Sequence, residues 1–328
     1  MEGGASVKAI VVAEGGGPEK LVLADIPDPT PAPGELIVQV SAAGLNFIDT
    51  YHRGGLYPMD LPFTPGLEGA GVVIEVGESV GDFSIGDRVG WTSVIGSYAE
   101  KHAVPTDAAI PIPDDVDEAT TAAVLLQGVT AHYLATDTFS LASGDRCLIH
   151  AGAGGVGLLL TQIAKLYGAE VITTVGTDEK AQLSRDAGAD HVVVYTRENF
   201  KDAIEDALGS HPLDVIYDGV GAATFEDSLD LLRPRGMMVT FGNASGPVPG
   251  VSPLTLAQKG SLFLTRPTMA HYLQTREELL GRANALFGWV SGGQLNVRVG
   301  AEYSLEQASD AHRALEGRQT TGKVLIRP

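Results

Sequence analysis

The segment from Arg146 to Gly168, RCLIHAGAGGVGLLLTQIAKLYG, constrains the fold of this chain more than any other. It joins a short apolar strand to an apolar helix through Gly152, Gly154 and Gly157, which have the spacing G-x-G-x-x-G. Glycines at this spacing permit a tight turn and bring the backbone close to a pyrophosphate, which the N–H groups at the helix start can hold. A glycine-rich turn used only for packing is the alternative, but the flanking strand and helix favour a dinucleotide site.

The sequence beyond this segment continues to alternate strands with helices. Apolar, strand-like segments at 170–176, 190–195 and 213–221 each precede a stretch of helical composition. Regular alternation of this kind predicts an α/β fold with a parallel, doubly wound sheet.

The first third of the chain has a different pattern. Short β-like runs such as KAIVVAE, ELIVQVSAAG and GAGVVIEVG are separated by Gly and Pro, which is typical of a compact, mostly β domain. With 328 residues, of which 44% are hydrophobic, the chain is long enough for two domains. We therefore expect a β-rich domain at 1–127 and 269–328, interrupted by a dinucleotide-binding domain at 128–268.

The residues after the second predicted strand bear on which dinucleotide binds. An NAD site places a carboxylate about 20 residues after the glycines, yet Gly176 and Thr177 stand at this strand tip. If Thr177 caps the next helix, Lys180 falls in its first turn, where the helix dipole disfavours a cation. A 2′-phosphate would remove this conflict, and Tyr195 at the next strand tip could reach the same place. Alternatively, Lys180 is a solvated side chain, Tyr195 a half-buried strand end, and Asp178 the missing acid.

Composition disfavours several classes of protein. The net charge of -19, from 22 basic and 41 acidic residues, repels nucleic acid and anionic membranes. No apolar run approaches the roughly 18 residues of a membrane helix, and the first residues lack the regions of a signal peptide. These features predict a cytoplasmic protein with no nucleic-acid or membrane partner. The single Cys147, in the strand-like DRCLIH, is expected to be a small core residue rather than a nucleophile.

The stretch AGLNFIDTYHRGGLYP sets polar and aromatic side chains close together, namely Asn46, Asp49, Tyr51, His52 and Tyr57. It could be a capped helical turn, a metal site or the floor of a substrate pocket. As a capped turn, it would have Asn46 as the N-cap and Asp49 in the first turn. Tyr51 and Tyr57 could contact a substrate or be core aromatics, and His52 is expected to be a surface or packing residue.

The whole chain resembles the medium-chain dehydrogenase/reductase superfamily. Zinc alcohol dehydrogenases of that superfamily carry G-x-C-x-x-D and G-H-E-x-x-G segments, which supply metal ligands. This chain has Gly44, Asn46 and Asp49 in the first segment, and GLEGAG, with Leu67 then Glu68, in the second. Because asparagine and leucine are not strong zinc ligands, and the cysteine-rich structural lobe is missing, we expect a metal-free site.

More narrowly, several segments resemble the quinone oxidoreductase branch, which includes zeta-crystallin: GLNFIDTYHRGGLYP, LLQGVTAHYL, HAGAGGVGLLLTQIAK, GTDEKAQ, YDGVG, FGNASGPV and LTRP. The resemblance implies a Rossmann sheet with a GroES-like β-rich catalytic domain, NADPH as cofactor and a small-molecule quinone as substrate. It also implies a homodimer, with SLFLTRP as an edge strand that could extend the sheet. The cofactor-binding positions that it implies are Asn46, Gln127, Thr130, Gly154, Gly155, Val156, Gly157, Gly176, Thr177, Lys180, Tyr195, Phe241, Gly242, Ser245 and Arg318.

Quinone chemistry agrees with a metal-free site. A quinone is already a strong electrophile that becomes aromatic on taking hydride and proton, so positioning is the main task of the protein. The predicted catalytic residues are Asn46, Tyr51, Tyr57 and Gln127, which offer hydrogen bonds to a quinone oxygen, and the tyrosines add ring faces for stacking. The alternatives are reduction of an enal or enone C=C bond, or a non-catalytic NADPH-binding or RNA-binding protein, although the net charge weighs against RNA.

Overall fold

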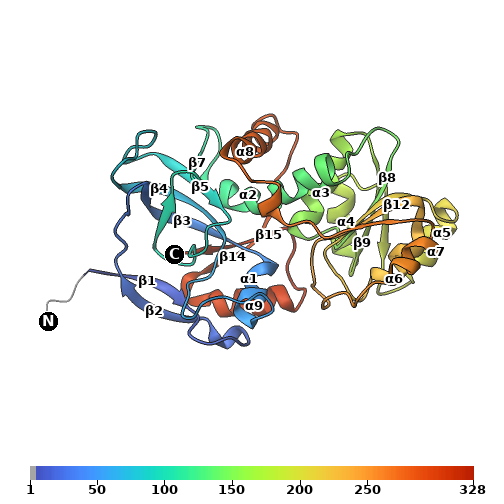
Figure 1. The fold of residues 1–328 in the computed structure, drawn as a ribbon, viewed down its shortest axis with the longest axis horizontal. Helices are drawn as coiled ribbons and strands as arrows, with labels where there is room; N and C mark the ends of the chain where they lie inside the picture. Colours follow the sequence, from blue (N-terminus) through green and yellow to red (C-terminus); the bar gives the residue numbers. More distant parts are fainter. Residues whose placement is uncertain (1–4) are drawn as a thin grey trace. The chain divides into compact units, whose positions relative to one another are not determined.

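The computed structural model describes residues 5–328, and the chain divides into two compact units. The first comprises Met1–Leu126, Leu273–Gly293 and Val297–Pro328, and the second comprises Gln127–Tyr272 and Gln294–Asn296. Figure 1 shows that strands dominate the first unit, whereas strands and helices alternate in the second. Within residues 5–328, no helix has both the length and the apolar character needed to cross a membrane.

The second unit is built on a parallel sheet with the strand order β10-β9-β8-β11-β12-β13. Counted along the chain from β8, this order is 3-2-1-4-5-6, which is that of a doubly wound dinucleotide-binding fold. The fold class predicted from the alternating pattern is therefore confirmed. The elements are β8 (Arg146–His150), α3 (Gly155–Leu166), β9 (Glu170–Val175), α4 (Asp178–Asp186), β10 (His191–Val194), α5 (Phe200–Leu208), β11 (Leu213–Asp218), α6 (Phe225–Leu231), β12 (Leu232–Thr240), α7 (Pro253–Gln258) and β13 (Phe263–Thr265).

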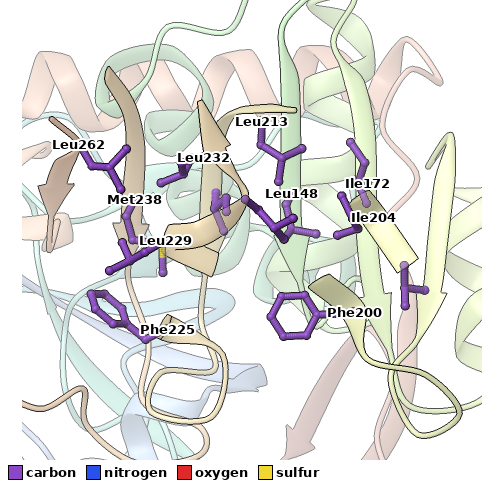
Figure 2. Close-up of a cluster of buried hydrophobic side chains, with 13 residues drawn as sticks. Leu148, Ile172, Phe200, Ile204, Leu213, Phe225, Leu229, Leu232, Met238 and Leu262 are labelled. Atoms are coloured by element: carbon purple, nitrogen blue, oxygen red, sulfur yellow. The ribbon is translucent and has the colours of Figure 1, made fainter. Parts of the chain in front are cut away.

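Helices cover both faces of this sheet (Figure 1), as the apolar strands require. On one face, strand residues such as Leu148, Ile172 and Met238 pack against Phe200 of α5 and Phe225 of α6 (Figure 2). Burial of each of these side chains contributes about 1.5–3 kcal/mol relative to exposure. Cys147, the neighbour of Leu148, is also buried, and burial raises the pKa of its thiol. The prediction that Cys147 is a core residue is thus confirmed.

The first unit contains a largely antiparallel sheet with the strand order β14-β15-β3-β4-β5-β7, to which β6 adds by pairing with β3. The exception is β14, which runs parallel to β15. A separate two-stranded sheet pairs β1 with β2. The elements of the first unit are β1 (Ser6–Val11), β2 (Val22–Pro27), β3 (Glu35–Leu45), α1 (Phe47–Gly54), β4 (Glu68–Val76), β5 (Arg88–Thr92), β6 (Lys101–Pro105), β7 (Ile110–Pro111), α8 (Arg276–Ser291), β14 (Val299–Ser304), α9 (Ala308–Glu316) and β15 (Lys323–Arg327). Helix α2 (Glu118–Tyr133) contributes residues to both units.

Strand β3 organises the first unit because it lies between β15 and β4. Its middle residues, such as Val38, join an apolar cluster with Trp91 of β5. Its last residues, such as Leu45, join another cluster with Val324 of β15 and Ala311 of α9. The strand ends directly before α1, so α1 starts at a point that the sheet holds in place.

One boundary differs from the sequence interpretation. The stretch of helical composition that follows the strand-like segment 213–221 is ATFEDSLDLLRPRG, but α6 ends at Leu231 and Leu232 begins β12. Pro234 explains the difference, since proline lacks an N–H and disfavours helical backbone at the residue before it.

Candidate functional site

The glycine-rich turn of the second unit joins β8 to α3, with Gly154 as the N-cap of the helix. A β-carbon on Gly157 would lie 2.3 Å from the Ala151 carbonyl oxygen, and one on Gly152 would lie 2.6 Å from Thr173 Cβ. These two glycines are therefore required by close packing. Around Gly154, only Ala151 O lies within 4 Å of such a β-carbon among the described residues. The turn has the open backbone and the helix N-terminus that bind a pyrophosphate.

Gln127 lies against this turn. A β-carbon on Gly155, the first residue of α3, would lie 1.8 Å from Gln127 Oε1, so the Gln127 amide fills that space. Thr130, one turn further along α2, is buried. The structure thus brings the predicted cofactor residue Gln127 to the predicted pyrophosphate turn.

The tip of β9 has the arrangement predicted for a phosphate site. The strand ends at Val175, and Thr177 caps α4, with its Oγ1 accepting a hydrogen bond from Lys180 N at 3.3 Å. Lys180 therefore lies in the first helical turn. The hydroxyl of Tyr195 lies 2.9 Å from where a β-carbon on Gly176 would be, so Tyr195 covers this turn.

Asp178 does not stand at the strand tip, because β9 ends at Val175 and Asp178 is the first residue of α4. Its carboxylate forms an ion pair with Arg197, which lies two residues after Tyr195. Sequence reasoning missed Arg197, although its place just beyond the third strand of the sheet was a usable signal. Both side chains are more than half exposed, so the pair adds little stability.

Two further loops, at the carboxyl ends of β11 and β12, are joined by hydrogen bonds and close backbone packing. Buried Asp218 accepts hydrogen bonds from Val220 N at 2.7 Å and from the Thr224 hydroxyl at 2.9 Å. The Ser245 hydroxyl donates to Val220 O at 2.8 Å, and a β-carbon on Gly242 would lie 2.3 Å from Gly219 O. The predicted cofactor residues Phe241, Gly242 and Ser245 lie in this assembly. Sequence reasoning missed Asp218, which organises it.

Arg318 belongs to the first unit, in a turn after α9, where its φ of 57° is left-handed. Lys180 and Tyr195 belong to the second unit. The predicted place of Arg318 beside them stays a prediction.

In the first unit, α1 has the geometry of the capped-turn alternative, with Asn46 as its N-cap and Asp49 in its first turn. Asp49 Oδ2 accepts a hydrogen bond from Asn46 N at 2.9 Å. The rings of Tyr51 and Tyr57 meet edge to face with centroids 5.3 Å apart, and His52 packs beside Tyr57. Both tyrosines are partly exposed, so they are not core aromatics.

A buried polar cluster surrounds the Asn46 side chain. Asn46 Nδ2 donates to Glu68 Oε1 at 2.6 Å and to Gly44 O at 3.2 Å. Asn46 Oδ1 accepts a hydrogen bond from Lys323 Nζ at 3.0 Å, and Lys323 also forms an ion pair with Glu68. Sequence reasoning missed the roles of Glu68 and Lys323. No local signal identified Lys323, because its partners come from distant strands.

Asp49 starts a second network of polar side chains, which connects α1 to α9; these two helices are neighbours in Figure 1. The Tyr98 hydroxyl donates to Asp49 Oδ2 at 3.0 Å and lies 3.4 Å from His312 Nε2. Arg53 Nη1 lies 2.9 Å from His312 Nδ1, and Arg53 pairs with Glu316 at 2.7 Å. Because a guanidinium can only donate, His312 Nδ1 accepts and the proton of neutral His312 is on Nε2.

Burial dominates the titration of these groups. It raises the pKa of Asp49 to about 7, although Asn46 N, Tyr98 and Lys323 oppose the shift. Burial and the charge of Arg53 lower the pKa of His312 to about 3. Burial also lowers the pKa of Lys323, and its partner Glu68 opposes this shift.

At the positions where related zinc enzymes hold their metal, this chain has Asn46 and Leu67. Within residues 5–328, no group of three or more His, Cys, Asp and Glu side chains is arranged to hold a metal ion. Instead, the ammonium of Lys323 contacts both Asn46 and Glu68. The ammonium thus occupies the position beside Asn46 Oδ1 and Glu68 Oε1 where a metal cation would otherwise have to bind.

Comparison with known proteins agrees with this architecture. The family model for the alcohol dehydrogenase GroES-like domain matches residues 32–114, and the model for zinc-binding dehydrogenases matches residues 155–280. A quinone oxidoreductase of Pseudomonas aeruginosa is 44% identical over 98% of this chain and 99% of its own length. A 2-haloacrylate reductase of a Burkholderia species is 38% identical over 98% of this chain and 99% of its own.

A solved structure has the same fold. The quinone oxidoreductase of Escherichia coli, determined in complex with NADPH, superposes with a TM-score of 0.94 at 41% identity. The match covers 98% of this chain and 99% of that one. From its two-unit architecture, its glycine-rich turn and these full-length matches, the chain belongs to the quinone oxidoreductase branch of the zinc-free medium-chain dehydrogenases/reductases.

Proposed function

We propose that this protein reduces quinones with NADPH. Bound NADPH supplies a hydride, and a quinone that takes this hydride and one proton becomes a hydroquinone. The observation that carries the proposal is the turn from Gly176 to Lys180 under the hydroxyl of Tyr195, in a fold shared with a quinone oxidoreductase that binds NADPH.

The second unit fits a phosphorylated dinucleotide. The turn at Gly154 offers backbone N–H groups to the pyrophosphate, and its tight packing at Gly152 and Gly157 holds them in place. The cation of Lys180 and the hydroxyl of Tyr195 would receive the 2′-phosphate, which prefers such donors. Gln127, against Gly155, lies at the start of the helix that would hold the pyrophosphate.

The first unit supplies the proposed substrate residues. Tyr51 and Tyr57 are partly exposed residues whose rings and hydroxyls suit stacking on a quinone and hydrogen bonding to its oxygen. Asn46 donates its Nδ2 hydrogens to Glu68 and Gly44, so it serves as a fixed wall of the site. The tyrosines therefore supply the donors to the quinone.

A second candidate reaction is reduction of an activated C=C bond. The 38% identity to a 2-haloacrylate reductase favours it, since hydride can add to the β-carbon of such an acceptor while a proton adds to the α-carbon. Consumption of NADPH in the presence of quinones and of 2-alkenals, measured at equal concentrations, tests the proposal. Faster turnover of quinones supports it, and turnover of alkenals alone would replace it with the second reaction.

Dimerisation and location extend the proposal. We propose a cytoplasmic homodimer in which β13, the edge strand of the second unit, extends the sheet across a two-fold axis. Phe263 in this strand is 57% exposed in the single chain. Light scattering of the protein and of Phe263→Glu tests this: a dimer that the substitution converts to monomer is expected.

A further inference from the structure

The orientation of the Asn46 amide is determined by two buried charges from distant strands. Lys323 at the start of β15 can only donate, and it contacts Asn46 Oδ1 at 3.0 Å. Glu68 at the start of β4 accepts from Asn46 Nδ2 at 2.6 Å. Since Lys323 and Glu68 also pair with each other, the three side chains form a closed ring of hydrogen bonds. Rotation of the amide by 180° would place oxygen against the carboxylate and nitrogen against the ammonium.

The surrounding backbone is built around this pair. A β-carbon on Gly44 would lie 2.4 Å from Glu68 Oε1 and 2.6 Å from Lys323 Cε. Glycine is therefore needed at this position to let both side chains reach Asn46. The second oxygen of Glu68 accepts a hydrogen bond from Leu126 N of α2 at 2.7 Å. Glu68 is thus anchored independently of Asn46.

We propose that Lys323 and Glu68 are positioning residues for quinone reduction, which hold Asn46 so that it forms a rigid wall of the reaction site. The inference rests on the proposed function, because it assigns Asn46 to that site. Rigid positioning matters for hydride transfer, since a misplacement of about 1 Å can lower the rate by roughly a hundredfold. If the ion pair of Lys323 and Glu68 served only stability, its removal would lower the free energy of unfolding but would not change kcat through Asn46.

A double-mutant cycle tests whether the pair acts through Asn46. The variants are Lys323→Met, Asn46→Ala and their combination, with the charge-neutral Glu68→Gln/Lys323→Met in case Lys323→Met does not fold. The readouts are kcat with 1,4-benzoquinone, the Kd of NADPH from fluorescence, and the midpoint of thermal unfolding. Lys101→Met is the matched control, because Lys101 pairs with Asp28 at 2.6 Å in the same unit.

We expect Lys323→Met or the neutral double variant to lower kcat by roughly ten- to a hundredfold, with a much smaller change in the Kd of NADPH. In the Asn46→Ala background, Lys323→Met should lower kcat no further. A kcat of either folded variant within about twofold of wild type, or effects that multiply across the cycle, would overturn the inference. Lys101→Met should keep the wild-type kcat.

A measurement on the unmodified protein does not depend on folded variants. The Nδ2 hydrogens of Asn46 should exchange slowly with water in NMR spectra, and fast exchange would contradict the fixed amide. If the unmodified protein reduces no quinone, the proposed function itself fails. If the protein is active and Asn46→Ala keeps its kcat, only the positioning inference fails.

Discussion

The hydroxyl of Tyr195 lies over Gly176, 2.9 Å from the position that a β-carbon on this glycine would occupy. The two residues directly follow the neighbouring parallel strands β9 and β10, and Lys180 lies in the helical turn that follows Gly176. A phosphate at this turn would meet a hydroxyl and a cation together.

Removal of the Lys180 charge should weaken the binding of NADPH more than the binding of NADH. Lys180→Ala should raise the KM for NADPH by roughly ten- to a hundredfold, because a charge-assisted contact to the 2′-phosphate is lost. The KM for NADH should change little. Steady-state kinetics with both cofactors check this, and Lys201→Ala, which removes a lysine paired with Asp230, is the control. Equal effects on both cofactors would refute the assignment.

A methyl group on Gly176 should disturb the proposed phosphate site by displacing the hydroxyl of Tyr195. Gly176→Ala must displace the partly exposed end of Tyr195, which can move without disrupting the core. We expect a several-fold rise in the KM for NADPH and a nearly unchanged melting temperature. Gly250→Ala, where nothing lies within 4 Å of the added carbon, should leave both quantities unchanged. A normal KM for NADPH in Gly176→Ala would show that Tyr195 does not contact the cofactor.

Substitution of Tyr57 should lower the catalytic efficiency with quinones more than it lowers the stability of the fold. Tyr57→Ala removes a ring that stacks edge to face on Tyr51, and should lower kcat/KM for quinones by roughly ten- to a hundredfold. Because Tyr57 is partly exposed, the loss of stability should remain below the approximately 3 kcal/mol of a buried aromatic. Tyr57→Phe separates the hydroxyl from the ring. A destabilised protein with normal turnover per folded molecule would argue against a substrate contact.

The buried network at Asp49 should make stability depend on pH. The folded pKa of Asp49 is about 7 against an ordinary value of 3.8, so its protonated form stabilises the fold below about pH 4. That contribution is lost as the pH rises to about 7, and it amounts to at most about 4 kcal/mol. The advantage in unfolding free energy of wild type over Asp49→Asn should therefore shrink between pH 4 and 7.

His312 provides a comparison of opposite sign. Its folded pKa of about 3 lies below the ordinary 6.5, so the unfolded chain takes up the extra proton and stability falls as the pH drops below 6.5. The advantage of wild type over His312→Gln should grow between pH 4 and 6.5. Urea unfolding at several pH values measures both differences. A difference between wild type and Asp49→Asn that does not change with pH would contradict the raised pKa.

The sequence alone was sufficient for features whose signals lie within a few residues. The G-x-G-x-x-G turn was predicted, and the caps at Thr177 and Asn46 were among the alternatives that the sequence offered, because capping and turn preferences depend on adjacent backbone groups. The strand and helix alternation likewise predicted the doubly wound sheet. The end of α6 was misplaced because a helical pattern outweighed the Pro234 signal.

Contacts between distant segments were decided only by the tertiary structure. Lys323 and Glu68 are 255 positions apart, and they meet because β15 and β4 flank β3 in one sheet. The contact between Tyr98 and His312 spans 214 positions. The sequence around Lys323 carries no sign of its buried partner, since the environment of a charge depends on which strands pair and which side chains they bring together. The alternation of strands and helices and the cofactor turn were therefore determined locally, whereas the buried charges around Asn46 and Asp49 were determined by the pairing of strands.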